Sequence, residues 1–457
     1  YLFVDSTDFL HYLNITRILS ISISTITIIP MYILARRFFD EKYSLVASCL
    51  FAFEPHLNIN SVFGLSEPIF ILAIILSTIF ILQKNHSWYF YLSFLLVGVV
   101  WWIRVNGFII VVILSIIFFI VYKPTPKNFF KCLLCIALVI IIVSPVLIQR
   151  YDQFGDPLYF DYGGKIFTGE FGTLQSVNTS NLDYTAINYI DEHGIMQFLD
   201  RFFITGIFNI VEQLTRISFP YLIFLIPFGI IFSLRAFDQT QKFVNANWIL
   251  ILTTLSLMVI IFAVIPERRF LFYLFPFLII FGTIPIQRLI EYGLSTFSFT
   301  HKQKNYSLLI IILIVIILSS LFLTRYDIQD QSEQQEQIEF IKLLNDRISG
   351  KILDAGNTLK GINYLNLSEP NTKFRSIGQE GIITSSVLYN ENINVINIFG
   401  STLNDFILNS EQENLKYIAI NEEGITEIWY PFLSDIYENG FFICPRPARA
   451  PHPIPIV

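Results

Sequence analysis

Charged residues are scarce in this chain. Only 14% of its 457 residues are Asp, Glu, Lys or Arg, against about 25% in a typical soluble domain. Hydrophobic residues make up 54% and stand in long blocks, which excludes a soluble globular protein. The net charge of -6 is spread along the chain, without the basic patch that nucleic-acid binding requires. We therefore expect an α-helical polytopic membrane protein with no nucleic-acid partner.

Cysteine and histidine are also few, at four and six residues. Cys132 and Cys135 form a C-x-x-C pair, but the pair opens an apolar run. This context indicates the start of a membrane helix and disfavours a redox loop or a metal site. His56 has no second histidine at metal-ligand spacing.

Both ends of the chain lack the features of an ordinary terminus. The first residue is Tyr1 rather than Met, and no signal peptide precedes it, so we expect N-terminal sequence to be missing. Residues 445–457 alternate proline with basic and apolar residues, which predicts a disordered tail.

The apolar blocks predict about ten membrane spans, because a span needs about 20 largely apolar residues. The second is interrupted by Glu54, Pro55 and His56, and the fourth is short and rich in Trp and Tyr. The candidates are residues 17–35, 43–62, 67–83, 88–103, 106–122, 129–149, 218–234, 247–265, 270–287 and 307–324.

The positions of Lys and Arg in the short loops predict the orientation, because these residues concentrate on the cytoplasmic side. With the N-terminus outside, most Lys and Arg of the short loops fall inside, and the outer connections hold Arg104, Arg150, Arg268 and Arg269. We expect a multi-pass protein of the cell membrane whose site and C-terminal domain are extracytoplasmic.

Two long segments lie outside the candidate spans. The first is acidic and aromatic, and we expect an extracytoplasmic loop with interfacial helices. The second alternates three short apolar runs (351–354, 394–399 and 417–420) with helix-like pieces (336–348, 402–408 and 431–437), which favours a small extracytoplasmic α/β domain. The predicted parts are an N-terminal membrane bundle (1–149), the loop (150–217), C-terminal spans (218–324), the α/β domain (325–444) and the tail (445–457).

The run Pro266–Arg269 is the leading functional candidate, because it places charge between two apolar stretches. Charge at membrane depth is costly and commonly faces a cavity. A guanidinium offers several planar donors that suit a phosphate head group. Arg268 and Arg269 also fall on the outer side, against the usual charge rule, which favours binding. The alternative is an interfacial anchor in which Glu267 pairs with Arg268.

Other ionisable residues approach the same outer face. Glu67 begins the third span and could act as a carboxylate beside an anionic substrate, or merely complement the helix N-terminus. Arg104 is either a snorkelling end charge or a donor to an anionic lipid. His56 is a substrate-binding candidate, although a lone histidine here is more often a hydrogen-bonding interfacial residue. Asp5 and Asp8 lie outside too, where they are catalytic candidates or solvated loop residues.

Several motifs occur in a familiar order. The first three are Tyr32-Ile-Leu-Ala-Arg-Arg-Phe-Phe, Leu50-Phe-Ala-Phe-Glu-Pro-His and Gly64-Leu-Ser-Glu-Pro. The later ones are Arg104-Val-Asn-Gly, Phe154-Gly-Asp-Pro-Leu, Glu267-Arg-Arg-Phe-Leu-Phe-Tyr-Leu-Phe-Pro, Lys416-Tyr-Ile-Ala-Ile and Trp429-Tyr-Pro-Phe-Leu. Together they resemble the GT-C membrane glycosyltransferases, and most closely archaeal-type members of the protein O-mannosyltransferase and aminoarabinose transferase group.

The resemblance implies transfer of a sugar from a polyprenyl (dolichyl-type) phosphate carrier to a hydroxyl at the outer face. The acceptor could be a protein, a lipid or a glycan. The group's catalytic acid lies in a first outer loop that would mostly precede Tyr1, so Asp5 and Asp8 are at best its trailing edge. Some members use a divalent metal and others do not, which leaves metal use open.

The same resemblance implies roles for individual residues. Glu67 becomes the second site carboxylate, and Arg268 and Arg269 become donors to the lipid phosphate, with Arg104 as a weaker companion. Tyr151, in the first outer segment, would help to shape the cleft for sugar and acceptor.

Two other functions compete with this interpretation. A secondary transporter would use Glu67 and the arginines as a coupling pathway, but we find no internal repeat and no matching pair of broken spans. A membrane-anchored binding protein would act through its C-terminal domain, and its spans would then be exchangeable.

Overall fold

The computed structural model describes residues 9–83, 88–104, 107–158, 166–167, 185–234, 241–324, 350–354, 393–395 and 403–419. Its contacts divide the chain into two compact units. One unit is a helical bundle formed by Leu13–Phe160 and Ile190–Tyr326. The other comprises Tyr1–Tyr12, Asp161–Tyr189 and Asp327–Val457. Each unit is described by itself.

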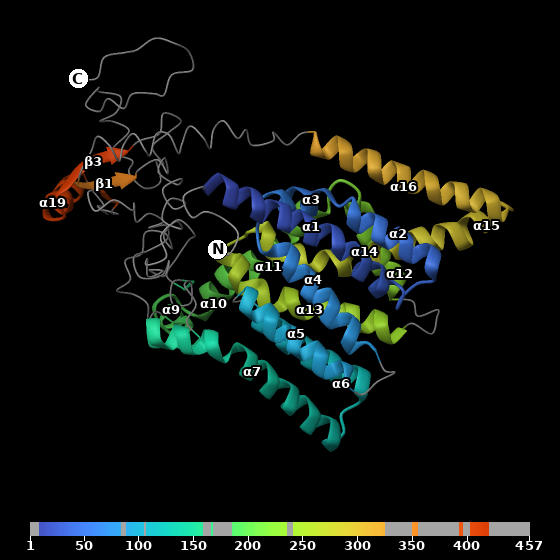
Figure 1. Ribbon diagram of the computed structural model, residues 1–457, viewed down its shortest axis with the longest axis horizontal. Helices are drawn as coiled ribbons and strands as arrows, with labels where there is room; N and C mark the ends of the chain where they lie inside the picture. Colours follow the sequence, from blue (N-terminus) through green and yellow to red (C-terminus); the bar gives the residue numbers. More distant parts are fainter. Residues whose placement is uncertain are drawn as a thin grey trace, which may run out of the picture. The chain divides into compact units, whose positions relative to one another are not determined.

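The N-terminal half of the bundle consists of helices at the predicted apolar blocks (Figure 1). Their bounds are α1 (Phe9–Ala35), α2 (Glu41–Ala52), α3 (Pro55–Val62), α4 (Glu67–Ile81), α5 (Tyr89–Ile103), α6 (Gly107–Tyr122) and α7 (Pro126–Phe154). The second predicted span is therefore two short helices, because Glu54 and Pro55 interrupt it. Cys132 and Cys135 are buried on α7, which confirms that their motif is part of a helix.

The C-terminal half contains more interrupted elements, including short π- and 3₁₀-helices. Their bounds are α9 (Ala186–His193), α10 (Ile195–Phe198), the π-helix η2 (Leu199–Ile204), α11 (Thr205–Ser218), α12 (Leu222–Ser233), α13 (Gln241–Val264), the 3₁₀-helix η3 (Arg268–Leu274), α14 (Phe275–Arg288), the π-helix η4 (Leu289–Gly293), α15 (Leu294–Thr296) and α16 (His301–Leu323). Each predicted span of this half coincides with a helix.

The chain is a polytopic helical membrane protein. When helices are counted by length and apolar composition, fewer of them can cross the membrane than the sequence pattern predicts. Five described helices are long and apolar enough to span, or six if α10–α11 and α12, bent by 115°, count as one. Helices α4, α5 and α6 have only 15 or 16 residues. At 1.5 Å per residue each is shorter than the roughly 30 Å hydrocarbon layer. The total of ten spans stays a prediction.

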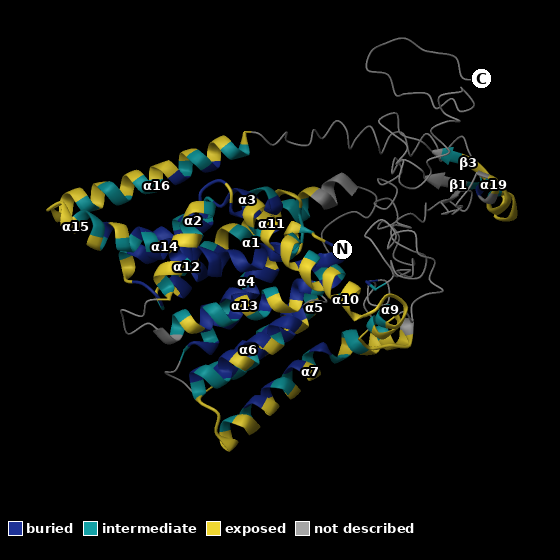
Figure 2. Ribbon diagram, turned by 180° about the vertical axis from the view of Figure 1, so that it is seen from behind, coloured by how far each residue is buried: buried dark blue, intermediate teal, exposed yellow. Residues whose placement is uncertain are grey.

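The core of the bundle lies around α14, of which nearly every residue is buried (Figure 2). Helix α12 packs closely against it, because Gly229 has no side chain: a Cβ there would lie 2.0 Å from the Phe281 carbonyl oxygen. Small residues allow such close backbone approach between membrane helices. Helix α16, by contrast, is largely exposed along its length.

Three interruptions of the helices lie on one side of this core. Pro55 follows the break between α2 and α3, Pro220 stands at the bend between α11 and α12, and Pro266 follows α13. Proline lacks an amide hydrogen and clashes with the preceding turn, so each helix ends there. A hydrogen bond connects two of these interruptions: the hydroxyl of Tyr221, which follows Pro220, donates to the carbonyl of Leu50 near the end of α2 at 2.9 Å.

The boundary of the first outer segment differs from the predicted one. Helix α7 continues to Phe154 and ends at Gly155, whose φ of +73° is the left-handed conformation typical of helix ends. Arg150 and Tyr151 are therefore helical, because the apolar pattern marks where a helix meets lipid and not where its hydrogen bonds stop. The predicted interfacial stretch contains α11, on which Ile207, Phe208 and Val211 are exposed.

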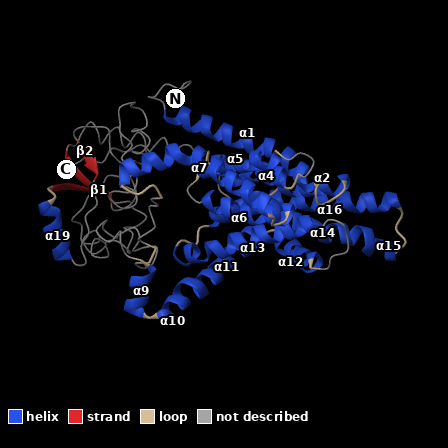
Figure 3. Cartoon of the chain, turned by 90° about the horizontal axis from the view of Figure 1, so that it is seen from below, coloured by secondary structure: helices blue, strands red, loops and turns tan. Residues whose placement is uncertain are grey.

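The second unit contains three short parallel strands and a helix (Figure 3). The strands are β1 (Gly350–Asp354), β2 (Ile393–Val395) and β3 (Leu415–Ala419), in the order β2-β1-β3, and the helix is α19 (Leu403–Gln412). Strands occur in all three short apolar runs of the sequence. Parallel pairing with a helix before β3 agrees with an α/β arrangement. Most of the predicted domain lies outside the described residues, as do the predicted helices in 336–348 and 431–437 and the tail.

Candidate functional site

Glu67 is the first residue of α4, placed there by the turn Gly64–Ser66. Gly64 has φ +69°, and a Cβ on it would lie 2.9 Å from the Thr16 hydroxyl oxygen of α1. The turn therefore needs glycine for both its conformation and its contact with α1. Pro68 follows in the first helical turn, where a missing amide hydrogen costs nothing.

Arg104 ends α5 and is positioned by a tight connection to α6. The Gly107 amide donates to the Arg104 carbonyl at 2.9 Å. A Cβ on Gly107 would lie 2.5 Å from the Trp101 Cα, so only glycine lets the two helices approach this closely. The Arg-x-x-Gly motif thus fixes where α5 ends and how Arg104 is oriented at that end.

Glu67 and Arg104 form a salt bridge, with Nη1 donating to Oε1 at 2.7 Å. The Glu67 side chain is 4% exposed and that of Arg104 19%. A buried carboxylate without a counter-charge would be strongly destabilising, so each residue depends on the other. The second carboxylate oxygen, Oε2, is buried and has no hydrogen-bond partner in the described part of the chain. Such an oxygen can accept a hydrogen bond from a substrate or a water.

Aromatic rings surround the Arg104 guanidinium. Its Cζ lies 5.9 Å from the ring centre of Phe70 and 5.8 Å from that of Phe270. Tyr273 packs edge-on against Phe70, with ring centroids 5.5 Å apart. Phe270 and Tyr273 belong to η3, in which residues three apart share a face. The pair Glu67–Arg104 is thereby connected to the element that carries the two arginines.

The two arginines at the start of η3 differ in their partners. Arg269 forms an ion pair with Glu267. Arg268 is exposed, and it forms no ion pair with any residue that the structure describes. The interfacial pairing anticipated for Glu267 therefore occurs, but with Arg269, and Arg268 is left as the available guanidinium.

His56 is 5% exposed and lies in the first turn of α3. Its Nε2 is 3.2 Å from the Phe219 carbonyl oxygen at the bend before α12. Since a carbonyl can only accept, this contact assigns the proton to Nε2. Glu54 is also buried, and its Oε2 accepts from the Leu57 amide at 2.7 Å. Glu54 therefore caps α3, as a side-chain oxygen at this position commonly does.

The predicted site residues that lie in the described ranges are not all close to one another. Tyr151 is exposed on α7, and no contact in the described ranges joins it to Glu67, Arg104 or Arg268. Asp5 and Asp8 lie outside the described residues. Sequence reasoning missed Phe70, Phe270 and Tyr273, although Phe70 follows Glu67 by three residues, the spacing of one helical face.

The described residues do not by themselves fit a divalent metal. No group of three or more His, Cys, Asp or Glu side chains gathers in the ranges that the structure covers. Glu67 offers one free oxygen, but the Arg104 cation already occupies the other at 2.7 Å and opposes a second cation. We derive no step through a metal.

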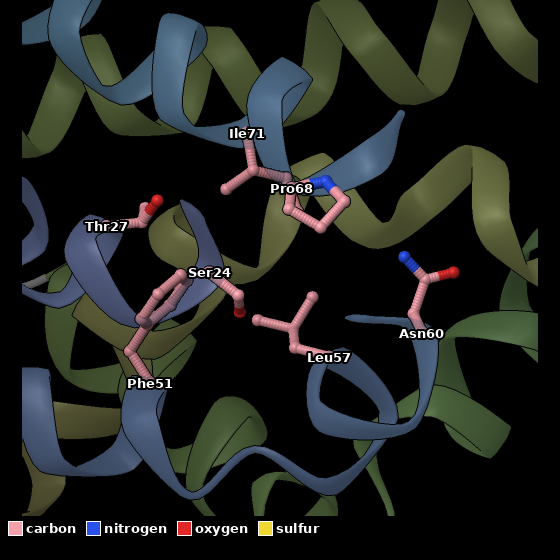
Figure 4. Close-up of a pocket in the computed structure, with 7 residues that line it drawn as sticks. All are labelled: Ser24, Thr27, Phe51, Leu57, Asn60, Pro68 and Ile71. Atoms are coloured by element: carbon pink, nitrogen blue, oxygen red, sulfur yellow. The ribbon is translucent and has the colours of Figure 1, made fainter. Parts of the chain in front are cut away.

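A small cavity lies beside this site, between α1, the α2–α3 break and α4 (Figure 4). Ser24, Thr27 and Asn60 contribute polar side chains to its apolar lining. Its volume of about 10 Å³ is that of a single water, so it cannot hold a sugar.

Comparison with known proteins supports the resemblance noted in the sequence for the N-terminal part of the chain. Residues 13–149 match the model of the dolichyl-phosphate-mannose-protein mannosyltransferase family. The resemblance to GT-C membrane glycosyltransferases is thereby confirmed. The matched segment includes Glu67 and Arg104 but not η3. Among curated proteins, none matches this chain.

Two solved structures show a broader and weaker likeness. The Archaeoglobus fulgidus oligosaccharyltransferase in complex with Zn and sulfate is 14% identical with a TM-score of 0.46, over 90% of this chain and 51% of that one. The same enzyme tethered to an acceptor peptide with the NVT sequon is 12% identical with a TM-score of 0.49, over 88% and 57%. This chain thus spans about half the length of that enzyme.

Proposed function

We propose that the protein is a membrane glycosyltransferase that moves a sugar from a polyprenyl (dolichyl-type) phosphate to an acceptor hydroxyl at the outer membrane face. The observation that carries the proposal is the contact between Glu67–Arg104 and η3. It places the Glu67–Arg104 pair of the family-matched segment against Phe270, which belongs to the same 3₁₀-helix as the exposed Arg268. A salt bridge that served only to stabilise the fold would not need this contact with η3.

The first role belongs to Arg268. The donor is a phosphodiester with one negative charge, and the leaving polyprenyl phosphate carries a second once the sugar C1–oxygen bond breaks. A guanidinium aimed at these oxygens stabilises the added charge in the transition state. Arg269 contributes less in this scheme, because Glu267 already balances its charge.

The second role belongs to Glu67. Arg104 holds its Oε1, so Oε2 is free to accept a hydrogen bond from a sugar or acceptor hydroxyl and to orient it. The acceptor oxygen attacks C1 and must lose its proton to a base. We assign the base to Asp5, Asp8 or an acidic residue of the same outer segment, since the charge of Glu67 is already balanced by Arg104.

The proposal includes the membrane orientation. With the N-terminus outside, the start of α4, the end of α5 and η3 lie at one outer face, while most Lys and Arg of the short loops remain inside. The acceptor class follows from whatever reaches this face and is a protein, a lipid or a glycan hydroxyl. Tyr151, exposed at the end of α7, is a candidate wall of the acceptor cleft.

The test is sugar transfer in proteoliposomes supplied with a panel of radiolabelled polyprenyl-phosphate sugars. We expect loss of label from the lipid, and a reduction of about 100-fold in Arg268→Ala, as for removal of other transition-state donors. Glu67→Gln should also lose activity. The matched control is Arg216→Ala, an exposed arginine of α11 whose side chain forms an ion pair with Glu212 one turn earlier in the same helix.

A secondary transporter is the second candidate, because the three broken helices resemble the discontinuous spans that form transport sites. The same proteoliposomes separate the two functions. Absence of transfer with every carrier, together with solute uptake that Glu67→Gln abolishes, would replace the transferase with the transporter. Transfer that persists undiminished in Arg268→Ala would remove the proposed phosphate contact.

A further inference from the structure

The 3₁₀-helix η3 is contacted on two sides by residues from distant parts of the bundle. On one side, Phe270 lies over the Arg104 guanidinium and Tyr273 packs on Phe70. On the other side, Phe272 lies against His56, with ring centroids 6.5 Å apart. Phe272 also contacts Phe275, the first residue of α14, three positions further on, so this second face of η3 continues into α14.

His56 is held in turn by two neighbours that do not belong to its own helix. Its Nε2 donates to the Phe219 carbonyl, and its ring packs edge-on against Phe322 of α16, with centroids 5.0 Å apart. The Arg268 charge lies close enough to act on the ring. His56 therefore stands where the α2–α3 break, the α11–α12 bend and η3 meet.

A short 3₁₀-helix needs such support. Its hydrogen bonds are poorly aligned and its runs rarely persist unaided beyond three or four residues, whereas η3 has seven. Carbonyls at a helix break also need a donor, because in a membrane no water replaces the lost partner. His56 meets both needs at once, by donating to Phe219 and by supporting Phe272.

We infer that His56 is a positioning residue that fixes η3 and thereby the direction in which Arg268 faces the substrate. Its Nε2 proton is used by the Phe219 carbonyl, and its ring packs on Phe272 and Phe322. The inference rests on the proposed function, because it assigns His56 its effect through the arginine of that site.

The test compares two amide substitutions, Gln and Asn, that place the side-chain nitrogen at different distances from the backbone. Gln places its amide nitrogen near the position of Nε2 and can still donate to Phe219, whereas Asn places it near Nδ1 and cannot reach. In His56→Asn we expect kcat/KM for the lipid donor to fall about tenfold, the size of one lost hydrogen bond. Part of this loss should appear in kcat, because Arg268 acts on charge that develops in the transition state, and His56→Gln should restore most of the activity.

Amide hydrogen exchange supplies a readout that does not depend on turnover. His56→Asn should accelerate exchange in residues 266–274 and leave α16 unchanged. If wild-type protein transfers no sugar, the proposed function fails, while the exchange result still decides whether His56 fixes η3.

Three outcomes would overturn the inference. One is equal kcat/KM values for His56→Asn, His56→Gln and wild type. Another is a tenfold loss that persists when His56→Asn is added to Arg268→Ala, which would show that His56 does not act through the arginine. The third is faster exchange throughout α2, α3, α11 and α12, which would show a general packing role.

Discussion

The two helical stretches Arg268–Thr296 and His301–Leu323 follow each other in the chain and differ sharply in their surroundings. Within an apolar segment of 18 residues, 83% of the first stretch is buried in the bundle, whereas the corresponding share of the second is only 11% (Figure 2). Yet the second is the more apolar, with an unbroken run of Leu, Ile and Val from Leu308 to Leu318. The buried stretch contains three arginines, two prolines and two glycines.

The difference teaches how to interpret composition in a membrane protein. Lipid chains are as apolar as leucine, so an all-apolar helix gains nothing by leaving them for the protein interior. Polar atoms and small residues are the ones that need neighbouring helices, either as partners or as room for close packing. Of the two stretches, the candidate site accordingly takes Arg268 and Phe270 from the less apolar one.

The largest expected effect comes from breaking the ion pair beside the buried stretch. Arg104→Ala leaves the Glu67 carboxylate buried without a counter-charge, which should lower the free energy of unfolding by about 3–5 kcal/mol. Denaturant titration in detergent micelles, followed by tryptophan fluorescence, measures the change.

A double variant separates stability from function. Arg104→Met combined with Glu67→Leu removes both charges and should recover most of the stability, because apolar side chains of similar volume replace such pairs well. Sugar transfer should stay lost. A stable Arg104→Ala would contradict the pair's structural role, and an active double variant would remove Glu67 from the site.

Much of the bundle could be predicted from the sequence. Each of the ten apolar blocks contains helix, and Glu67, Arg104 and the motif around Arg268 were identified by their charge at membrane depth. These predictions need only local information, because a charge or a run of apolar residues is visible without knowing its neighbours.

The remaining features depend on contacts between distant segments. Nothing local shows that Glu267 pairs with Arg269, or that Phe270 covers Arg104 across more than 160 positions of sequence. The hydrogen bond from His56 to Phe219 joins two helix breaks, and a backbone acceptor has no sequence signature. Helix lengths also escaped prediction, since the apolar pattern of α7 ends before its hydrogen bonds do.

A smaller effect is expected from glycine substitutions that test close packing in the buried stretch. Gly229→Ala in α12 would place a methyl group 2.0 Å from the Phe281 carbonyl oxygen and must push α12 away from α14. Overpacking of this kind typically costs about 1–3 kcal/mol. Thermal unfolding in micelles should show a lower midpoint.

The matched control is Gly293→Ala, where the added methyl meets only a flexible Leu289 side-chain carbon at 3.3 Å. This variant should be neutral or slightly stabilised, because alanine has the higher helix propensity. Equal losses in both variants would mean that the cost reflects glycine in general and not contact with α14.

The smallest effect compares the same one-methyl deletion in the two stretches. Ile279 on α14 is fully buried, whereas Ile310 on α16 is 53% exposed. Ile279→Val should cost about 1 kcal/mol, since a buried methyl leaves a space that the packed core only partly fills. Ile310→Val should be indistinguishable from wild type, because lipid or detergent chains flow into the space. Denaturant titration of both variants under identical conditions gives the difference directly. If Ile310→Val proved as costly as Ile279→Val, α16 would have to be covered by protein in the membrane, and its apolar surface would be an interface instead of a lipid-facing side.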